Sequence, residues 1–362
     1  MPTYRELQKV KYQKNIDDLI RILPFAVRVY VIAMESTVSP HTLYEYLYCL
    51  NRFFTFIHDN NPVLKKKPVS EISYKDIDRI TADDIDEFLH TVYQNNLDAA
   101  HPEKAKKTRN HYLSPIRSFF SFLFSRDKIK ANVVEKIERS KYQKKQAVVK
   151  LDQDEEKRMM STVQSGIGLS ERVLRIRDNN NLMTARDEAI IQVLLRTGIR
   201  VSELVGLDVK HIHFDQHCFT IQRKRDKPDV VYMDDETEDI LRSYIKLKNA
   251  LGSLYKMDKD AVFIVTVGKY FGQRMSVRSV QLLVKKYAVA GVPETGSVIT
   301  PHRLRATFAT DLLRASDGDI KFVQEALAHE SIQTTLIYTG NDTSDKRKYR
   351  NLLKNESDSD KE

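Results

Sequence analysis

The sequence predicts a mainly α-helical protein of two domains, with a small antiparallel β-sheet in the second. The chain has 362 residues, more than one ordinary hydrophobic core accommodates, and 41% of them are hydrophobic, which is typical of packed globular structure. Residues 1 to about 140 show the helical period of apolar side chains. Two strand-like segments, CFTIQRK and DVVYM, lie close together further along the chain and predict a hairpin.

The first half contains two well-marked helix starts. Ser39 followed by Pro40 is a good N-terminal cap, and Thr81 followed by Asp84 resembles a capping box. The first of these helices should bury one apolar stripe, which consists of Leu43, Leu47, Leu50, Phe54 and Ile57.

The segment from Glu103 to Phe124 is the best candidate in this half for contact with a nucleic acid. Apolar residues on one face would pack inward and leave a basic face outside. A charged face is more often simply solvated, so the pattern alone leaves the question open. Pro115 should kink this helix or mark its start. The candidate DNA-binding side chains here and just beyond are Lys104, Lys106, Lys107, Arg109, Arg117, Lys141, Lys144 and Lys145.

Residues 140–150 are basic and lack an amphipathic period, which predicts a linker between domains 1–145 and 146–362. A helix should open near Leu151, where several carboxylates suit the positive helix end better than a metal site. Thr184 with Asp187 predicts the start of another helix that Gly198 ends, and residues 261–265 predict a further short strand.

Residues 300–340 concentrate cations, histidines and a tyrosine. Thr300 and Pro301 predict a helix to Ala315, Asp319 should cap a second helix over 320–328, and Ser331 should cap a third. Such a set suits attack by a tyrosine hydroxyl on a phosphodiester. Arginines would stabilise the charge that grows on the phosphoryl oxygens, and a neighbouring histidine would assist the proton transfer.

The motifs PHRLRATFATDLL, LAHES, TTLIYT, RTGIRVSEL and IQRKRDKPDVV resemble those of the tyrosine recombinase (phage integrase) family. The resemblance implies a two-domain clamp: a helical, SAM-like core-binding domain with its TRNHYLSPIRSFF segment on DNA, and a catalytic domain. The residue before the LAHES histidine is Ala328 where the family often has glycine, and Ala306 replaces a frequent histidine. The resemblance implies that Glu203 supports the first arginine and that the catalytic residues are Arg200, Lys224, His302, Arg305, His329 and Tyr338, with Tyr338 as the nucleophile that forms a 3′-phosphotyrosine.

The choice of the lysine depends on family register. Local sequence could not distinguish Lys224 from Arg223, Arg225 and Lys227, which are treated as decoys.

Within the family, the amino-terminal region resembles single-component Xer recombinases of the XerS kind. That resemblance implies resolution of chromosome dimers at a dif-like, inverted-repeat DNA site through a Holliday junction. It also implies a homotetramer on two double-stranded DNA sites, the FtsK translocase as a partner, and a C-terminal helix near 343–356 exchanged between protomers. Alternatives are an integrase or transposase of a mobile element, a catalytically silent DNA-binding factor on the same fold, and a type IB topoisomerase.

Composition bears on the partner, the metal content and the location of the protein. The net charge of +9 favours a polyanionic partner, although a merely basic protein would have it too. The two cysteines, Cys49 and Cys218, are too few and too far apart for a disulfide framework or a zinc site, and the histidines of HIHFDQH lack the remaining ligands of a metal site. We expect no metal, no cofactor, no membrane-spanning segment and a cytoplasmic location.

Overall fold

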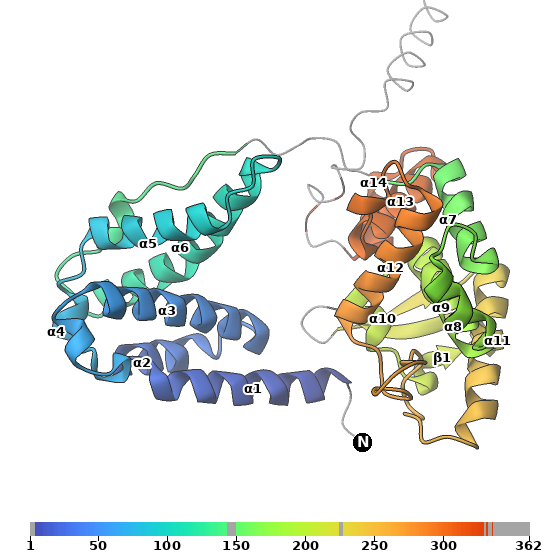
Figure 1. Cartoon of the computed structure of the whole chain (residues 1–362), viewed down its shortest axis with the longest axis horizontal. Helices are drawn as coiled ribbons and strands as arrows, with labels where there is room; N and C mark the ends of the chain where they lie inside the picture. Colours follow the sequence, from blue (N-terminus) through green and yellow to red (C-terminus); the bar gives the residue numbers. More distant parts are fainter. Residues whose placement is uncertain (1–3, 143–149, 224–226, 329–330, 332–334, 336–362) are drawn as a thin grey trace, which may run out of the picture. The chain divides into compact units, whose positions relative to one another are not determined.

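The computed structural model describes residues 4–142, 150–223, 227–328, 331 and 335. The chain divides into two compact units, Met1–Lys144 and Lys145–Glu362 (Figure 1). Across these described ranges, no helix is both long enough and apolar enough to cross a lipid bilayer.

The described part of the first unit is helical throughout. Its 3-10 turns are Leu64–Lys66, Val69–Glu71 and Val133–Lys136. Its α-helices are α1 (Tyr4–Ile22), α2 (Phe25–Met34), α3 (Pro40–Asn60), α4 (Tyr74–Ile77), α5 (Ala82–Asn95) and α6 (Pro102–Phe124).

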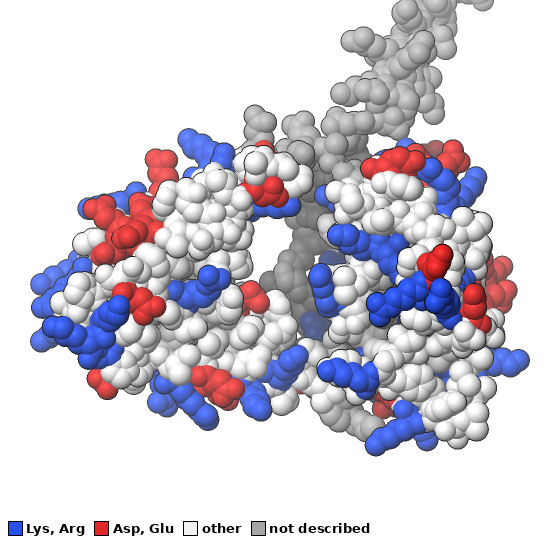
Figure 2. Space-filling model, viewed as in Figure 1, with Lys and Arg blue, Asp and Glu red and all other residues white. Residues whose placement is uncertain are grey.

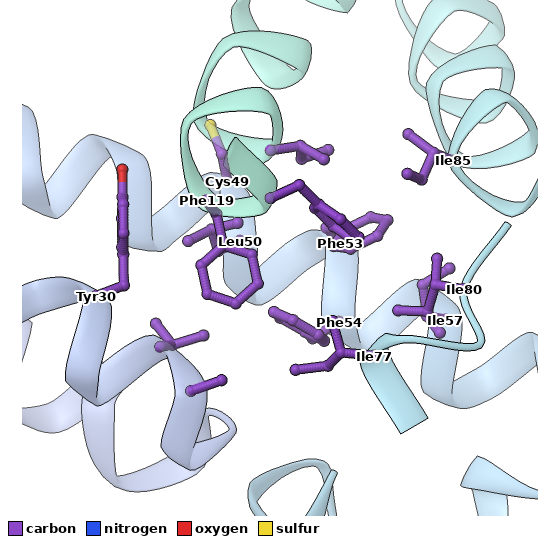
Figure 3. Close-up of a cluster of buried hydrophobic side chains, with 14 of the residues drawn as sticks. Tyr30, Cys49, Leu50, Phe53, Phe54, Ile57, Ile77, Ile80, Ile85 and Phe119 are labelled. Atoms are coloured by element: carbon purple, nitrogen blue, oxygen red, sulfur yellow. The ribbon is translucent and has the colours of Figure 1, made fainter. Parts of the chain in front are cut away.

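One hydrophobic core holds this unit together. Helix α3 packs against α1 and α6, and α5 also packs against α6. Phe53, Phe54 and Phe119 are fully buried at the centre, with aromatic rings meeting edge to face (Figure 3). Edge-to-face contacts add to the hydrophobic stabilisation, so the rings fix the helix packing.

The predicted helix starts in this unit are confirmed. The Ser39 hydroxyl accepts a hydrogen bond from the Thr42 amide at 3.2 Å, and Pro40 occupies the first helical position. Thr81 and Asp84 form a reciprocal capping box. The predicted apolar stripe of α3 is buried, because each of its members faces the core.

Pro115 does not mark the start of its helix, because α6 begins at Pro102 and continues through the proline. A proline inside a helix removes one backbone donor. Pro115 is itself buried, as are Leu113, Ile116 and Phe119 of the same helix.

The second unit is mainly helical with one small sheet. Its 3-10 turns are Val209–His211, Phe214–Gln216 and Gly296–Val298. Its regular elements are α7 (Gln153–Ser165), α8 (Glu171–Asp178), α9 (Asn181–Thr197), α10 (Val201–Val205), β1 (Ile212–His213), β2 (Cys218–Gln222), β3 (Pro228–Tyr232), α11 (Asp235–Gly252), α12 (Val277–Gly291), α13 (Pro301–Ala315) and α14 (Ile320–Ala326).

Helix α9 is the centre of this unit and packs against α7, α11 and α13. The sheet has the order β1-β2-β3 with both pairs antiparallel, which confirms the predicted hairpin. In β2, Phe219 and Ile221 point to the buried side, as their alternation predicts.

Two predictions for this unit were wrong. Helix α9 starts three residues before Thr184, because the Asn180 side chain accepts from the Met183 amide at 2.8 Å and caps it. Asp187 is therefore no capping residue, and it lies fully buried within the helix, where Lys286 and Tyr287 donate to it. Residues 261–265 form no strand; they make only isolated bridges, at Ala261 and Ile264.

Candidate active site

Arg200 is held at a sharp junction between two helices. Helix α9 ends at Gly198, which has a left-handed φ of 59°, and Arg200 is the N-terminal cap residue of α10. A Cβ atom added at Gly198 would lie only 2.2 Å from the Phe308 ring. Glycine is therefore required here both by the backbone angle and by the neighbouring ring. The Arg200 side chain remains 38% exposed, so it can reach a ligand.

Glu203 fixes the direction of Arg200. One carboxylate oxygen accepts from Arg200 Nη1 at 2.8 Å, and the other accepts from the Arg200 backbone amide at 2.7 Å. The Glu203 side chain is only 5% exposed, so this carboxylate is shielded from water. Because the shielded carboxylate is hydrogen-bonded to both the side chain and the amide of Arg200, it restricts the orientation of a guanidinium that itself stays partly exposed.

Arg305 is buried in the interior of α13. Its Nη1 donates to the carbonyl of Gly198, and its Nη2 donates to the carbonyl of Leu327 at 2.5 Å. This guanidinium therefore connects the end of α9, just before Arg200, with the end of α14.

His302 lies one turn before Arg305 on α13 and is exposed. Partial desolvation, followed by the positive charges of Arg303, Arg305 and Arg200, lowers the pKa of His302 below its ordinary value. The structure thus places His302 in one cluster with the cationic side chains of Arg200 and Arg305. A histidine with a lowered pKa is neutral at pH 7 and can accept a proton.

The other three predicted catalytic residues, Lys224, His329 and Tyr338, lie outside the described residues, as do the cap of the third helix and the 343–356 segment. Their flanking elements are described. The Arg223 amide donates to the Lys227 carbonyl at 2.7 Å and closes the β2–β3 hairpin. On the other side, the predicted second helix is capped by Asp319 but ends at Ala326, because Ala328 takes a left-handed φ of 47°.

The sequence assigns Arg223 no role among the hairpin cations, but it is buried next to the Arg200–Glu203 pair. Its Nη1 donates to Glu203 Oε2 at 3.1 Å and its Nε donates to Asp229 Oδ2 at 2.7 Å. The alternation of β2 could have indicated this position, because residue 223 follows Phe219 and Ile221 on the buried face.

The predicted DNA-binding face of α6 also binds part of the chain itself. Arg117 donates to the Ile137 carbonyl at 2.6 Å, and Arg109 donates to the Glu138 carbonyl at 2.9 Å and to Asp86 at 3.1 Å. Asn110 and Ser140 exchange two hydrogen bonds of 2.9 Å.

This face therefore fixes the path of residues 137–140 near the end of the first unit.

The remaining candidate DNA-binding lysines differ in exposure. Lys104, Lys107 and Lys141 are exposed, Lys106 is half-buried, and Lys144 and Lys145 lie outside the described residues.

The described residues contain no group of three or more His, Cys, Asp or Glu side chains that could hold a metal ion. In the HIHFDQH segment, two histidines have side-chain partners from other elements. His213 pairs with Thr220 at 3.1 Å, and His217 pairs with Glu238 at 2.8 Å.

In the second unit, the glycine-ended helix α9 thus presents Arg200 beside α13, which carries the H-x-x-R residues His302 and Arg305. Residues 150–345 match the phage integrase family, and residues 30–127 match the N-terminal SAM-like domain of phage integrases. The chain therefore belongs to the phage integrase family and is a tyrosine site-specific recombinase.

Curated relatives agree with this assignment. The chain is 32% identical over 228 residues to the tyrosine recombinase XerC of Escherichia coli O127:H6 (strain E2348/69 / EPEC), covering 63% of this chain and 67% of the relative. It is also 32% identical, over the same length and shares, to the tyrosine recombinase XerC of Salmonella typhi.

Solved structures share the fold. The XerH recombinase bound to a palindromic difH substrate superposes with a TM-score of 0.60 at 20% identity, over 87% of this chain and 81% of that one. A lambda integrase dimer bound to a COC' core site gives a TM-score of 0.56 at 15% identity, over 88% and 77%.

Proposed function

We propose that this recombinase binds double-stranded DNA, cuts one strand with Tyr338 and rejoins it to a new partner. The Tyr338 hydroxyl oxygen attacks the phosphorus, a 3′-phosphotyrosyl bond forms, and the bond to the 5′ oxygen breaks. Lys224 gives the leaving 5′ oxygen its proton. One phosphate ester replaces another, so the step needs no ATP, metal or other cofactor.

The observation that carries this proposal is the cluster of Arg200, His302 and Arg305. Negative charge grows on the nonbridging phosphoryl oxygens in the transition state, and fixed cationic donors stabilise it. Arg200 is preorganised by Glu203 and remains partly exposed, so it suits direct contact with the phosphate. His302, neutral at pH 7, would take the tyrosine proton, and His329 would add a further donor.

DNA binding is proposed to involve both units. Lys and Arg side chains occur on the visible face of each unit, interleaved with Asp and Glu (Figure 2). The exposed lysines of α6, Lys104 and Lys107, and the exposed Lys141 are the side chains that we propose contact phosphates. Each phosphate contact releases counterions, so binding should weaken steeply with salt.

At a finer level, we propose the role of a single-component Xer recombinase. Four protomers would act on two dif-like sites with inverted repeats and resolve chromosome dimers through a Holliday junction, with the FtsK translocase as activator. The XerC relatives and the XerH–difH likeness support this role. The segment near 343–356 would dock on the next protomer and link the assembly to Tyr338.

A nicked suicide substrate tests the nucleophile. Tyr338→Phe should retain DNA binding in a gel shift and lose the covalent adduct seen on a denaturing gel. The matched control is Tyr349→Phe, which changes the other nearby tyrosine and should retain the adduct. An adduct that persists in Tyr338→Phe would overturn the assignment.

A further inference from the structure

Arg223 contacts three separate elements of the second unit. Its Nη1 donates to Glu203 in α10 at 3.1 Å, its Nε donates to Asp229 in β3 at 2.7 Å, and its Nη2 donates to the Ala326 carbonyl at the end of α14 at 3.3 Å. The side chain is only 7% exposed, so it is not arranged to contact DNA phosphates from the surface.

From this geometry we infer that Arg223 is a positioning residue for Arg200, acting through Glu203. The inference rests on the proposed function, in which Arg200 contacts the scissile phosphate. Arg223 and Arg200 both donate to the Glu203 carboxylate, so the influence of Arg223 on Arg200 passes through this shared group.

The Glu203 carboxylate divides its contacts between the two arginines. Oε1 accepts from the Arg200 side chain, and Oε2 accepts from the Arg200 amide and from Arg223. Without Arg223, the full negative charge of this buried group would face Arg200 alone. The Arg200 guanidinium would then be drawn towards Glu203 and away from a phosphate, because charge interactions strengthen where water is excluded.

The planar fork of arginine is needed for this arrangement. Each of its three nitrogens donates a hydrogen bond to a different element at the same time, and a single ammonium group cannot donate in these three fixed directions. The same guanidinium thus fixes the β2–β3 hairpin, which leads into Lys224. It also fixes Glu203, which is the partner of Arg200, and the end of α14, which precedes His329 in sequence. Two cationic contacts to successive carbonyls, Arg223 to Ala326 and Arg305 to Leu327, hold that helix end.

The test compares cleavage of a normal phosphodiester with cleavage of a neutral methylphosphonate at the same position. A methylphosphonate lacks one nonbridging negative oxygen, so it depends less on a well-placed arginine. For Arg200→Ala, the rate deficit against wild type should be large on the phosphate and much smaller on the methylphosphonate. Arg223→Ala should behave in the same way, with a deficit on the order of 100-fold on the phosphate.

Two variants sharpen the comparison. Arg223→Lys keeps the charge but not the three directions, so it should give an intermediate deficit on the phosphate. Arg175→Ala is the matched control, because it removes an arginine from an exposed pair with Glu171, 80% and 89% exposed, and should cleave both substrates as wild type does. Both rates come from one preparation, so a partly unfolded variant would lower them equally.

The outcomes distinguish the positioning role of Arg223 from the proposed function of Arg200. If Arg223→Ala loses equally on both substrates, or loses nothing while Arg200→Ala is impaired, the positioning role is wrong and the proposed function stands. If Arg200→Ala itself shows no deficit on the phosphate, the proposed function fails. The further loss of cleavage rate caused by Arg223→Ala should also be smaller in a protein that already carries Glu203→Gln, because Arg223 acts through Glu203.

Discussion

Replacing Gly198 with alanine should damage both the stability of the second unit and its active site. Glycine has a left-handed φ of 59° at this position, and an added Cβ would lie 2.2 Å from Cδ1 and 2.9 Å from Cε1 of Phe308. The left-handed angle costs roughly 1–2 kcal/mol for alanine. Displacing the packed ring costs about 1–3 kcal/mol more.

Alanine recovers about 0.4–1 kcal/mol through its smaller unfolded-state entropy. The net loss is therefore about 3 kcal/mol, which lowers the melting temperature of a unit of this size by about 6–12 °C. Differential scanning calorimetry of the full chain measures this directly. Cleavage should fall as well, because the Gly198 carbonyl is an acceptor for Arg305.

Two other glycines separate strain from collision. Gly318 has a φ of 87° with nothing within 4 Å of an added Cβ, so Gly318→Ala should show strain alone. Gly252 has neither a positive φ nor a close neighbour, so Gly252→Ala should leave the melting temperature unchanged or slightly higher. In Gly198→Ala, the further change Phe308→Leu should recover part of the loss. A Gly198→Ala protein no less stable than Gly318→Ala would refute the reasoning.

Three further predictions concern protonation and strain. Burial raises the pKa of Asp76, but hydrogen bonds from Lys67 and Ser73 outweigh it and lower that pKa to about 2 from 3.8. The resulting stabilisation of the folded state, about 2 kcal/mol, is present above pH 4 and lost as the pH falls towards 2. Asp76→Asn should therefore remove the loss of stability between pH 4 and pH 2 from the acid-unfolding curve. An unchanged curve would contradict this prediction. Ala328→Gly should relieve the strain of the left-handed φ angle. The melting temperature should rise slightly, because the relief of strain exceeds the larger unfolded-state entropy of glycine. A lower melting temperature would contradict the strain argument. The cleavage rate should decline as the pH falls through the lowered pKa of His302, and a pH profile that His302→Gln leaves unchanged would exclude it as the base.

Helix ends with local capping could be predicted from the sequence, because the cap side chain and the backbone amide that donates to it lie within three residues. Ser39, Thr81 and Asp319 are of this kind. Helix α9 shows the limit of such reasoning. A threonine and an acid at positions 184 and 187 look like a capping box, yet Asp187 is held by Lys286 and Tyr287 from a helix a hundred residues away.

The active site divides in the same way. Motif spacing led to Arg200, His302 and Arg305, and the described structure places these three close together. The alternation of β2 indicates that Arg223 is buried, but not its partners Glu203 and Ala326, which are 20 and 103 residues away in sequence. The sequence pattern places Arg109 and Arg117 on a basic outer face. Their acceptors include backbone carbonyls of residues 137 and 138, which no side-chain pattern indicates.

The two arginines proposed to bind the phosphate differ in what their loss would measure. Arg200 is partly exposed, and its described side-chain contact is to Glu203, so the rate lost in Arg200→Ala is mainly lost transition-state stabilisation. Arg305 is 2% exposed and donates to the carbonyls of Gly198 and Leu327 at the ends of two helices, so its removal takes a donor from each of them. The rate lost in Arg305→Ala therefore also contains the displacement of the Gly198 turn and of the end of α14. Only the part of its deficit that disappears on a neutral methylphosphonate can be assigned to the phosphate.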